Sequence, residues 1–157
     1  TLFSLLYDCA TYGSGLAMTS ANQEFTQTEC RRMLELMSAN DLERLLQGGI
    51  PEGVRISHKN GWLNNTGLIG DAGIVYPSNG RNYIIAVFLW EDSEFHDYLR
   101  LWPIVEGISR ATWNYFNPED ELLSPRDLPN SAQECEGNFL PPHEQVDLDN
   151  INGWRTP

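Results

Sequence analysis

Lysine is almost absent from this chain. Lys59 is the single lysine among 157 residues, and arginines carry the rest of the positive charge. Acidic residues outnumber basic ones, so the formal net charge is −12. Phosphate backbones repel a chain of this charge, and we therefore exclude nucleic acid as a partner. The isolated lysine is then a residue whose position needs an explanation.

The sequence also lacks long apolar runs and clusters of metal-ligating residues. No stretch approaches the roughly 18 apolar residues of a membrane helix, so we predict no membrane span. Cys9, Cys30 and Cys135 form no C-x-x-C pair, and no cysteine–histidine cluster has zinc spacing. We predict neither a metal site nor another cofactor.

Two of the three cysteines fall on predicted helices. Apolar residues at helical spacing predict the first helix over 1–9, with Thr1 either its N-cap or, as we favour, a residue partway into it. The sequence T-Q-T-E at 26–29 is a capping box that begins the second helix. If these helices pack together, Cys9 and Cys30 could form a disulfide; buried free thiols are the alternative.

Two further helices are expected. A short one begins at Asp41 and ends at Gly48-Gly49, with Leu42, Leu45 and Leu46 inside. The last helix starts near Trp102, because Pro103 suits a first helical turn, and 94–101 forms a helical lead-in. Its predicted apolar face consists of Ile104, Ile108, Ala111 and Tyr115.

Between these helices the hydrophobic period changes to two. Strands are predicted over 53–60, 68–76 and 82–90, and their short connections predict an antiparallel meander. The fold class is therefore α+β, an antiparallel sheet packed against helices. The unbroken apolar run of 82–90 predicts burial on both faces. We read His58 as a packed residue and Asp71 as a hydrogen-bonding residue at a turn or strand end.

The predicted sheet is incomplete. In a three-stranded meander the strand 82–90 lies at an edge, yet it carries no charge, proline or bulge signal over 84–89. Natural proteins rarely leave such an edge bare. We expect further strands from an upstream segment of the same protein or from a second chain. We divide the chain into a domain over 1–117 and an acidic, proline-rich tail over 118–157.

The order of these elements resembles the C-terminal portion of the class A β-lactamase and penicillin-binding-protein family. Three motifs mark those serine enzymes: S-x-x-K, S-D-N and K-T-G. The sequence HKNGW (58–62) stands at the K-T-G position, GDAGIVYPSNGRNYIIAVFLW (70–90) matches the two strands that follow, and 102–117 matches the closing helix. The resemblance covers about 1–117 and implies a β-lactamase-like fold.

The resemblance implies a role for each residue of the K-T-G position. Lys59 places a cation where a substrate carboxylate can lie, and Asn60 can donate a second hydrogen bond to it. Gly61 lets the substrate run close to the strand. The backbone N–H of Trp62 would be one of two oxyanion donors. The predicted substrate is thus a small molecule or peptide with a carboxylate.

This sequence departs from the family pattern in two ways. Asn60 replaces the usual threonine, and Trp62 is bulky where the family usually has a small residue. S-x-x-K cannot occur, because Ile56 precedes the single lysine by three positions. We read the S-x-N sequences at 20–22 and 38–40 as chance occurrences. The nucleophile is therefore expected upstream of residue 1, and this chain alone should be inactive.

Two functions follow as hypotheses. The first is the C-terminal part of a serine hydrolase or acyltransferase that acts on amide, β-lactam or peptide carbonyls through an acyl-enzyme. The alternative is a non-catalytic binding or structural module of the same fold. The resemblance implies an extracytoplasmic location, whether secreted, periplasmic or at the cell surface.

Overall fold

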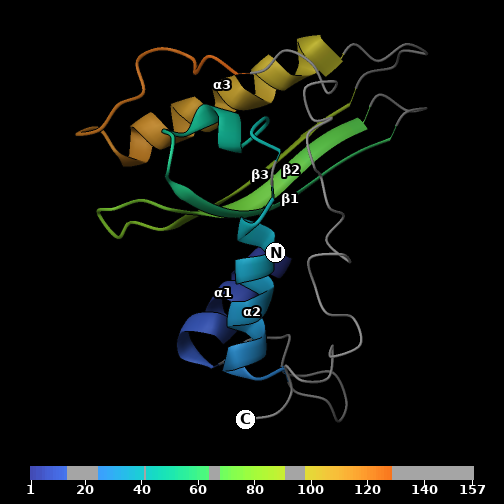
Figure 1. The fold of residues 1–157 in the computed structure, drawn as a ribbon, viewed down its shortest axis with the longest axis vertical. Helices are drawn as coiled ribbons and strands as arrows, with labels where there is room; N and C mark the ends of the chain where they lie inside the picture. Colours follow the sequence, from blue (N-terminus) through green and yellow to red (C-terminus); the bar gives the residue numbers. More distant parts are fainter. Residues whose placement is uncertain (14–24, 41, 64–67, 91–97, 129–157) are drawn as a thin grey trace.

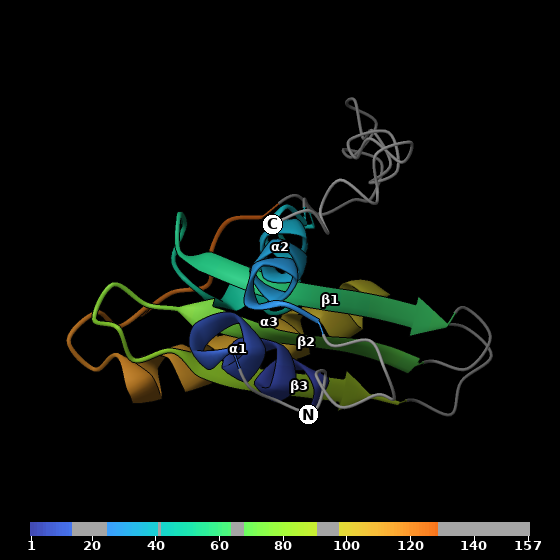
Figure 2. The same cartoon turned by 90° about the horizontal axis from the view of Figure 1, so that it is seen from below.

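The computed structural model describes residues 1–13, 25–40, 42–63, 68–90 and 98–128. Within these ranges a three-stranded antiparallel sheet lies between two helical layers (Figure 1). Helices α1 and α2 lie on one face of the sheet, and the short helix η2 and the long helix α3 on the other (Figure 2). The predicted α+β class, with an antiparallel sheet packed against helices, is confirmed.

Helix α1 (Leu2–Tyr12) begins at Thr1, whose hydroxyl accepts a hydrogen bond from the Ser4 N–H at 3.2 Å. Thr1 is therefore the N-cap in this chain, which is one of the two alternatives that the sequence left open. Helix α2 (Gln27–Ser38) has the predicted capping box, since Thr26 and Glu29 bond each other's backbone N–H groups.

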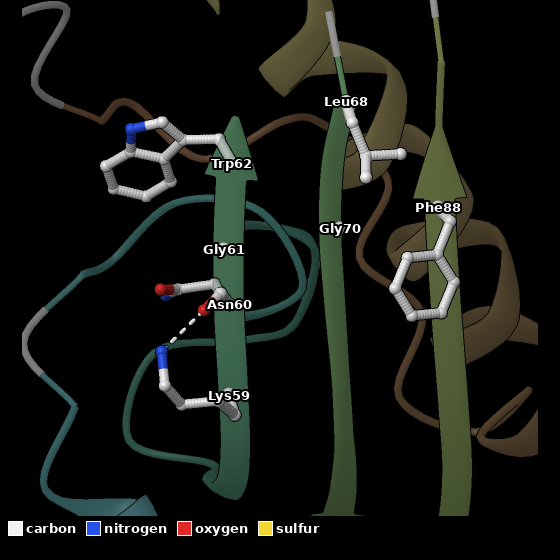
Figure 3. Close-up of a pocket in the computed structure, with 7 residues that line it drawn as sticks. All are labelled: Lys59, Asn60, Gly61, Trp62, Leu68, Gly70 and Phe88. Atoms are coloured by element: carbon white, nitrogen blue, oxygen red, sulfur yellow. Dashed lines mark hydrogen bonds between the residues drawn. The ribbon is translucent and has the colours of Figure 1, made fainter. Parts of the chain in front are cut away.

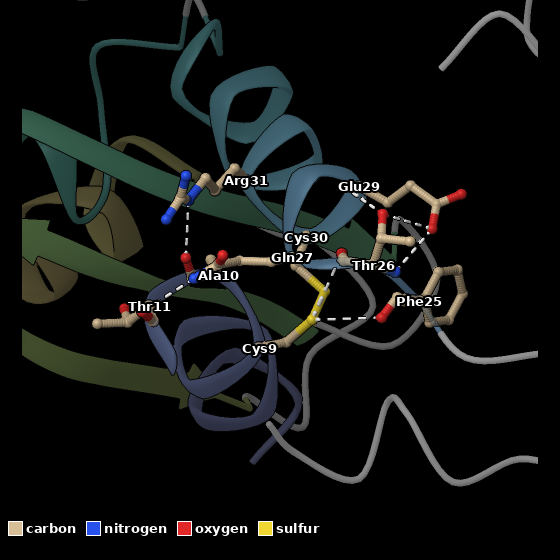
Figure 4. The surroundings of a disulfide bond; sticks show 9 residues. All are labelled: Cys9, Ala10, Thr11, Phe25, Thr26, Gln27, Glu29, Cys30 and Arg31. Atoms are coloured by element: carbon tan, nitrogen blue, oxygen red, sulfur yellow. Dashed lines mark hydrogen bonds between the residues drawn. A yellow bond between two sulfur atoms is a disulfide. The ribbon is translucent and has the colours of Figure 1, made fainter. Parts of the chain in front are cut away.

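A disulfide joins α1 to α2. It links Cys9 to Cys30, whose Cα atoms are 5.9 Å apart, and both residues are fully buried (Figure 4). The alternative of two free thiols is excluded in this structure. Beside the bridge, the Arg31 guanidinium donates to the carbonyl of Ala10. The two helices thus form one unit that packs on the sheet through a core around Ile74.

The helix expected after Asp41 is absent from residues 42–46, and Asp41 itself lies outside the described residues. The chain forms a turn followed by the 3₁₀ helix η2 (Gln47–Gly49). Leu45 has a left-handed φ of 58°. The Leu46 N–H donates to Asp71 Oδ2, and its carbonyl accepts from Ser109. These tertiary hydrogen bonds fix both backbone polar groups of Leu46, whose carbonyl also accepts from the Gly49 N–H in η2.

The three predicted strands are present. They are β1 (Arg55–Leu63), β2 (Leu68–Tyr76) and β3 (Tyr83–Leu89), paired antiparallel in the order β1-β2-β3. In register, Lys59 lies opposite Ala72, and Ala72 lies opposite Ala86. The predicted meander is confirmed.

Burial of β3 differs from the prediction. Tyr83, Ile85 and Val87 are buried against η2 and α3, whereas Ile84 and Phe88 on the other face are 38% and 69% exposed. The prediction of burial on both faces was wrong for the described chain, because α1 reaches only the start of β3, where Asn82 donates to the Tyr7 hydroxyl, and leaves Ala86 and Phe88 exposed. Within the described residues β3 is an edge strand with one open face.

Helix α3 (Tyr98–Phe116) also buries a different face from the one predicted. It runs continuously through Pro103 instead of starting near it. The buried side chains are Leu101, Trp102, Val105, Ser109 and Trp113. The predicted apolar face is the exposed one. The polar Ser109 obscured the true stripe, although its hydroxyl is satisfied by Leu46.

The chain after α3 returns along that helix. Trp113 Nε1 donates to the carbonyl of Asp120, and the Leu122 N–H donates to Asn114. Leu128 is buried next to Gly48. The first part of the predicted tail therefore packs on α3 and η2, and 129–157 lies outside the described residues.

Candidate functional site

Lys59 projects from the free edge of β1. Its side chain is exposed, and its ammonium donates to the carbonyl of Asn60 at 2.6 Å (Figure 3). Within the described part of the chain, no carboxylate forms an ion pair with it. A cation with only a neutral protein partner remains available to a ligand carboxylate.

A hollow of about 340 Å³ adjoins this lysine. All four residues of the predicted site line it, and they are joined by three residues of β2 and β3: Lys59, Asn60, Gly61 and Trp62 with Leu68, Gly70 and Phe88. Figure 3 shows Trp62 leaving β1 away from β2, while Phe88 lies on the other side of the hollow. The structure thus brings the predicted residues together and adds an apolar wall that the sequence did not indicate.

Two glycines form the floor of the hollow. A Cβ atom at Gly61 would meet nothing within 4 Å, so the space above this residue is open. A Cβ at Gly70, in the opposite position on β2, would collide with the Phe88 ring. Another backbone can therefore approach β1 closely at Gly61, as the K-T-G resemblance implied.

Asn60 and Trp62 are the residues that depart from the family pattern. The Asn60 Nδ2 atom is enclosed and has no hydrogen-bond partner among the described residues. A buried unsatisfied amide costs about 1–3 kcal/mol, which an added acceptor would recover. The Trp62 side chain is 44% exposed beside the hollow. Asn60 Nδ2 is thus a donor without an acceptor in the described chain, and Trp62 lies at the side of the hollow.

A buried polar network lies behind β1. His58 Nδ1 donates to the Asp71 carboxylate at 3.0 Å, and His58 Nε2 is 3.2 Å from Gln47 Oε1. His58 and Asp71 are each 1% exposed. His58 is packed, as predicted, but Asp71 lies in the middle of β2, so its expected place at a turn or strand end was wrong. The sequence feature that could have indicated this network is an aspartate between glycine and alanine inside an otherwise apolar strand.

A second set of charged side chains lies around η2. Arg44 and Glu106 form an ion pair at 2.9 Å, and Arg44 lies over the Trp102 ring. Burial raises the pKa of Glu106, while Arg44 and Arg126 oppose that shift. Since these residues face η2 and not the hollow, their role is to attach that segment to α3.

In the part of the chain that the structure describes, no group of three or more histidine, cysteine and acidic side chains is arranged to hold a metal ion. None of the described helices is long and apolar enough to cross a membrane.

Comparison with known proteins places this geometry in a family. The profile of the Beta-lactamase enzyme family matches residues 10–116. PBP-A is 26% identical over 60% of this chain and 34% of its own length, with a TM-score of 0.53. A PBP-A variant solved as an acyl-enzyme complex with penicillin G shares the fold at 22% identity and a TM-score of 0.58, over 74% of this chain and 38% of its own.

A β-lactamase from Sphaerobacter thermophilus is 25% identical over 64% of this chain and 35% of its own, with a TM-score of 0.49. No curated protein matches. The chain spans little more than a third of the solved structures that it resembles. The family profile nevertheless covers most of the sequence, including the three strands that line the hollow and the residues 58–62. The chain therefore belongs to the β-lactamase enzyme family, with a β-lactamase-like and penicillin-binding-protein-like fold.

Proposed function

We propose that this chain supplies the substrate-carboxylate side of a serine hydrolase or acyltransferase that acts on amide, β-lactam or peptide carbonyls. The observation that carries the proposal is the Lys59 ammonium, which has no ion-pair partner in the described chain and adjoins the open floor at Gly61. Family membership supports the reaction class.

Each residue has a stated role. The Lys59 ammonium binds the substrate carboxylate, and rotation of the Asn60 side chain brings its enclosed Nδ2 atom to the same carboxylate, while the substrate backbone lies against Gly61. A serine from outside this chain attacks the carbonyl carbon, and its hydroxyl proton passes to a base that is also outside. The Trp62 N–H donates to the carbonyl oxygen as it becomes anionic. As this intermediate collapses, the base returns its proton to the leaving nitrogen, so that the amine is expelled and the acyl-enzyme remains for attack by water or an amine.

The missing serine and base come from an upstream part of the same protein or from a second chain. The open edge of β3 supports this, because it can pair with a strand of that polypeptide. The coverage of the PBP-A structures supports it as well, because about two thirds of their length has no counterpart here.

The proposed location is extracytoplasmic. The disulfide between Cys9 and Cys30 supports it, since such bonds persist in oxidising compartments and are rare in the cytosol.

The test is acylation by a fluorescent penicillin of the protein expressed from its complete reading frame. We expect a covalent label, and Lys59→Met should slow labelling by about 10²-fold, as loss of a charge-assisted contact does. Gly61→Ala should also slow labelling without loss of stability, because the added methyl enters open space. Gly107→Ala is the matched control, since its Cβ also meets nothing within 4 Å and lies on α3. No label on the complete protein would contradict the proposal.

The second candidate is a binding module without chemistry. Trp62 favours it, because a large side chain at the oxyanion position narrows the approach to β1. In that case penicillin would bind reversibly, as calorimetry would show, and no covalent label would form.

A further inference from the structure

Residues 117–128, which we call the C-terminal strap, leave the end of α3 and run back along that helix (Figure 1). Two contacts hold the first half of the strap to α3. Trp113 Nε1 donates to the carbonyl of Asp120 at 2.7 Å, and the Leu122 N–H donates to Asn114 Oδ1 at 2.9 Å. The family profile ends at the last residue of α3, so the match to the family does not account for the contacts of the strap.

The second half of the strap reaches η2. Arg126 Nη1 donates to the carbonyl of Gln47 at 3.2 Å, and Arg126 Nη2 lies 3.8 Å from the Glu43 carboxylate. Leu128 is buried, and its Cδ1 atom would lie 2.8 Å from a Cβ atom at Gly48. Glycine at this position leaves the room that the leucine fills, so the strap packs closely against η2.

Gln47 contacts the strap with its backbone and β1 with its side chain. While its carbonyl accepts from Arg126, its Oε1 atom lies 3.2 Å from His58 Nε2. The other ring nitrogen, His58 Nδ1, lies 3.0 Å from the Asp71 carboxylate, and the whole side chain of His58 is buried. A ring that is held at both nitrogens fixes the backbone of β1 at the residue directly before Lys59.

We propose that the C-terminal strap positions Lys59 for the substrate carboxylate. Arg126 is the positioning residue, and it acts through Gln47 and His58. This inference rests on the proposed role of Lys59 in binding that carboxylate. His58 and Lys59 are consecutive in a strand, so their side chains lie on opposite faces of the sheet. The strap therefore supports β1 from the buried face, while Lys59 adjoins the hollow on the other face.

Arg126 carries this role more than Leu128 does. The Arg126 side chain is 14% exposed, and a hydrogen bond from a charged donor is roughly twice as strong as a neutral one. Leu128 contributes apolar contact, which has no directional preference. The orientation of the Gln47 peptide therefore depends on the Arg126 guanidinium.

The test compares Arg126→Met, Arg126→Lys and Arg32→Met in the protein expressed from its complete reading frame. Arg32→Met is the matched control, because it removes an arginine that pairs with Glu35 at 3.0 Å on α2, across the sheet from η2. Stopped-flow labelling with a fluorescent penicillin separates the dissociation constant of the noncovalent complex from the rate constant of acylation.

We expect Arg126→Met to raise the dissociation constant at least about fivefold, because a displacement of about 1 Å at a positioning contact is costly. The rate constant of acylation should change by less than about twofold, because the contact of Lys59 with the carboxylate is the same in the bound complex and in the transition state. Arg126→Lys keeps a charged donor and should recover most of the affinity, and Arg32→Met should bind as the parent does.

A second measurement follows the His58 ring and needs no chemistry. In nuclear magnetic resonance, the ring nitrogen signals of His58 should shift in Arg126→Met, return toward the parent positions in Arg126→Lys and stay unchanged in Arg32→Met. Thermal unfolding of each variant shows that it is folded at the temperature of these measurements. If Arg126→Met is unfolded, Arg126→Gln takes its place under the same criteria, since it removes the charge and keeps a polar group.

Two outcomes overturn the inference. One is a folded Arg126→Met protein with the dissociation constant and the His58 signals of the parent. The other is an equal loss of affinity in Arg126→Met and Arg126→Lys with unshifted His58 signals, since Arg126 would then act by another route.

The same measurements separate this inference from the proposed chemistry. Acylation of the parent with unchanged binding in Arg126→Met rejects the strap alone. If the parent binds penicillin without acylation, calorimetry gives the dissociation constants. A rise in Arg126→Met then supports the strap, while the missing label rejects the chemistry. A parent protein that neither binds penicillin nor becomes labelled rejects both.

Discussion

The two sides of the sheet differ in how completely they are packed. On the β1 side, buried hydrogen bonds to Asp71, with His58 and from Ser109 fix η2 and the Leu46 residue before it, and Gly49 lies against the backbone of α3. On the β3 side, Phe88 and Ile108 are exposed, and the strand edge has no partner in the described chain.

This difference distinguishes the β1 side, which contacts within the described chain stabilise, from the β3 side, which has apolar surface available to other polypeptide. Buried polar groups on the β1 side are satisfied within the chain, so substitutions there should act on folding itself. Among the described residues nothing covers the apolar groups on the β3 side, so substitutions there should act chiefly on assembly.

The largest expected effect is at the centre of the closed side. Asp71→Ala should lower the free energy of unfolding by about 3–5 kcal/mol, because it leaves buried His58 and the Leu46 N–H without their acceptor. Asp127→Ala, at an exposed position, should change it by less than about 0.5 kcal/mol. Urea unfolding followed by circular dichroism measures both. Equal effects would mean that the buried network does not hold the β1 side together.

A smaller loss is expected where η2 meets α3. Gly49→Ala should cost about 1–3 kcal/mol, because its Cβ would collide with the carbonyl of Glu106 and with Ser109. Gly107→Ala, on the solvent side of α3 where a Cβ meets nothing within 4 Å, should leave stability unchanged or raise it by up to about 1 kcal/mol. Thermal unfolding of the two variants compares them directly, and a Gly49→Ala protein as stable as the parent would contradict this close contact.

Neighbouring residues of β3 compare the two faces of one strand. Ile85→Thr should cost about 1–3 kcal/mol, since it places a hydroxyl in the core, whereas Ile84→Thr should cost less than about 0.5 kcal/mol in this chain. Chemical denaturation gives both values. In the complete protein the cost of Ile84→Thr should rise. A large cost of Ile84→Thr in the isolated chain would show that the β3 face is already covered.

The smallest effect is a dependence of stability on pH. Burial raises the pKa of Glu106 above its ordinary value of 4.5, so the folded chain binds this proton more tightly than the unfolded chain does. Stability from this group is present below pH 4.5 and is lost as pH rises through the higher folded value. Glu106→Gln should remove that decline, which unfolding measurements at a series of pH values above 4.5 would show.

Glu119 provides the opposite case. Its hydrogen bond from Asn79 lowers the pKa of Glu119, so stability from this exposed group is lost as pH falls through the lowered value. Glu119→Gln should therefore remove a loss of stability at low pH. If Glu106→Gln and Glu119→Gln changed the pH dependence of stability in the same direction, the opposite pKa shifts given to these two residues would be contradicted.

The sequence predicted those elements whose signals are local. The capping box at Thr26, the period of two in the strands and the K-T-G-like tripeptide at Lys59 each depend on neighbouring residues, and β1, β2, β3 and α2 formed as expected. The four predicted site residues line one hollow because they are consecutive on one strand.

Predictions failed where residues far apart in the sequence determine the conformation or the burial of a segment. Leu45 and Leu46 have helical spacing, but hydrogen bonds to Asp71 and Ser109, far along the chain, impose a turn instead. On α3 the exposed face at Ile108 has an unbroken apolar pattern at helical spacing. The buried face does not, because it contains the polar Ser109, and the sequence therefore predicted the wrong face as buried. Burial of β3 on both faces was expected from an apolar run, yet the described chain covers one face.

Amide hydrogen exchange of β3 tests the central claim that the β3 side is where further polypeptide completes the enzyme. About half of the amides in an edge strand point away from its neighbour. In the 157-residue chain these outward amides of Tyr83–Leu89 should exchange freely, and in the protein from the complete reading frame they should slow by about 10³-fold or more. Equally fast exchange of β3 in both proteins would contradict the account.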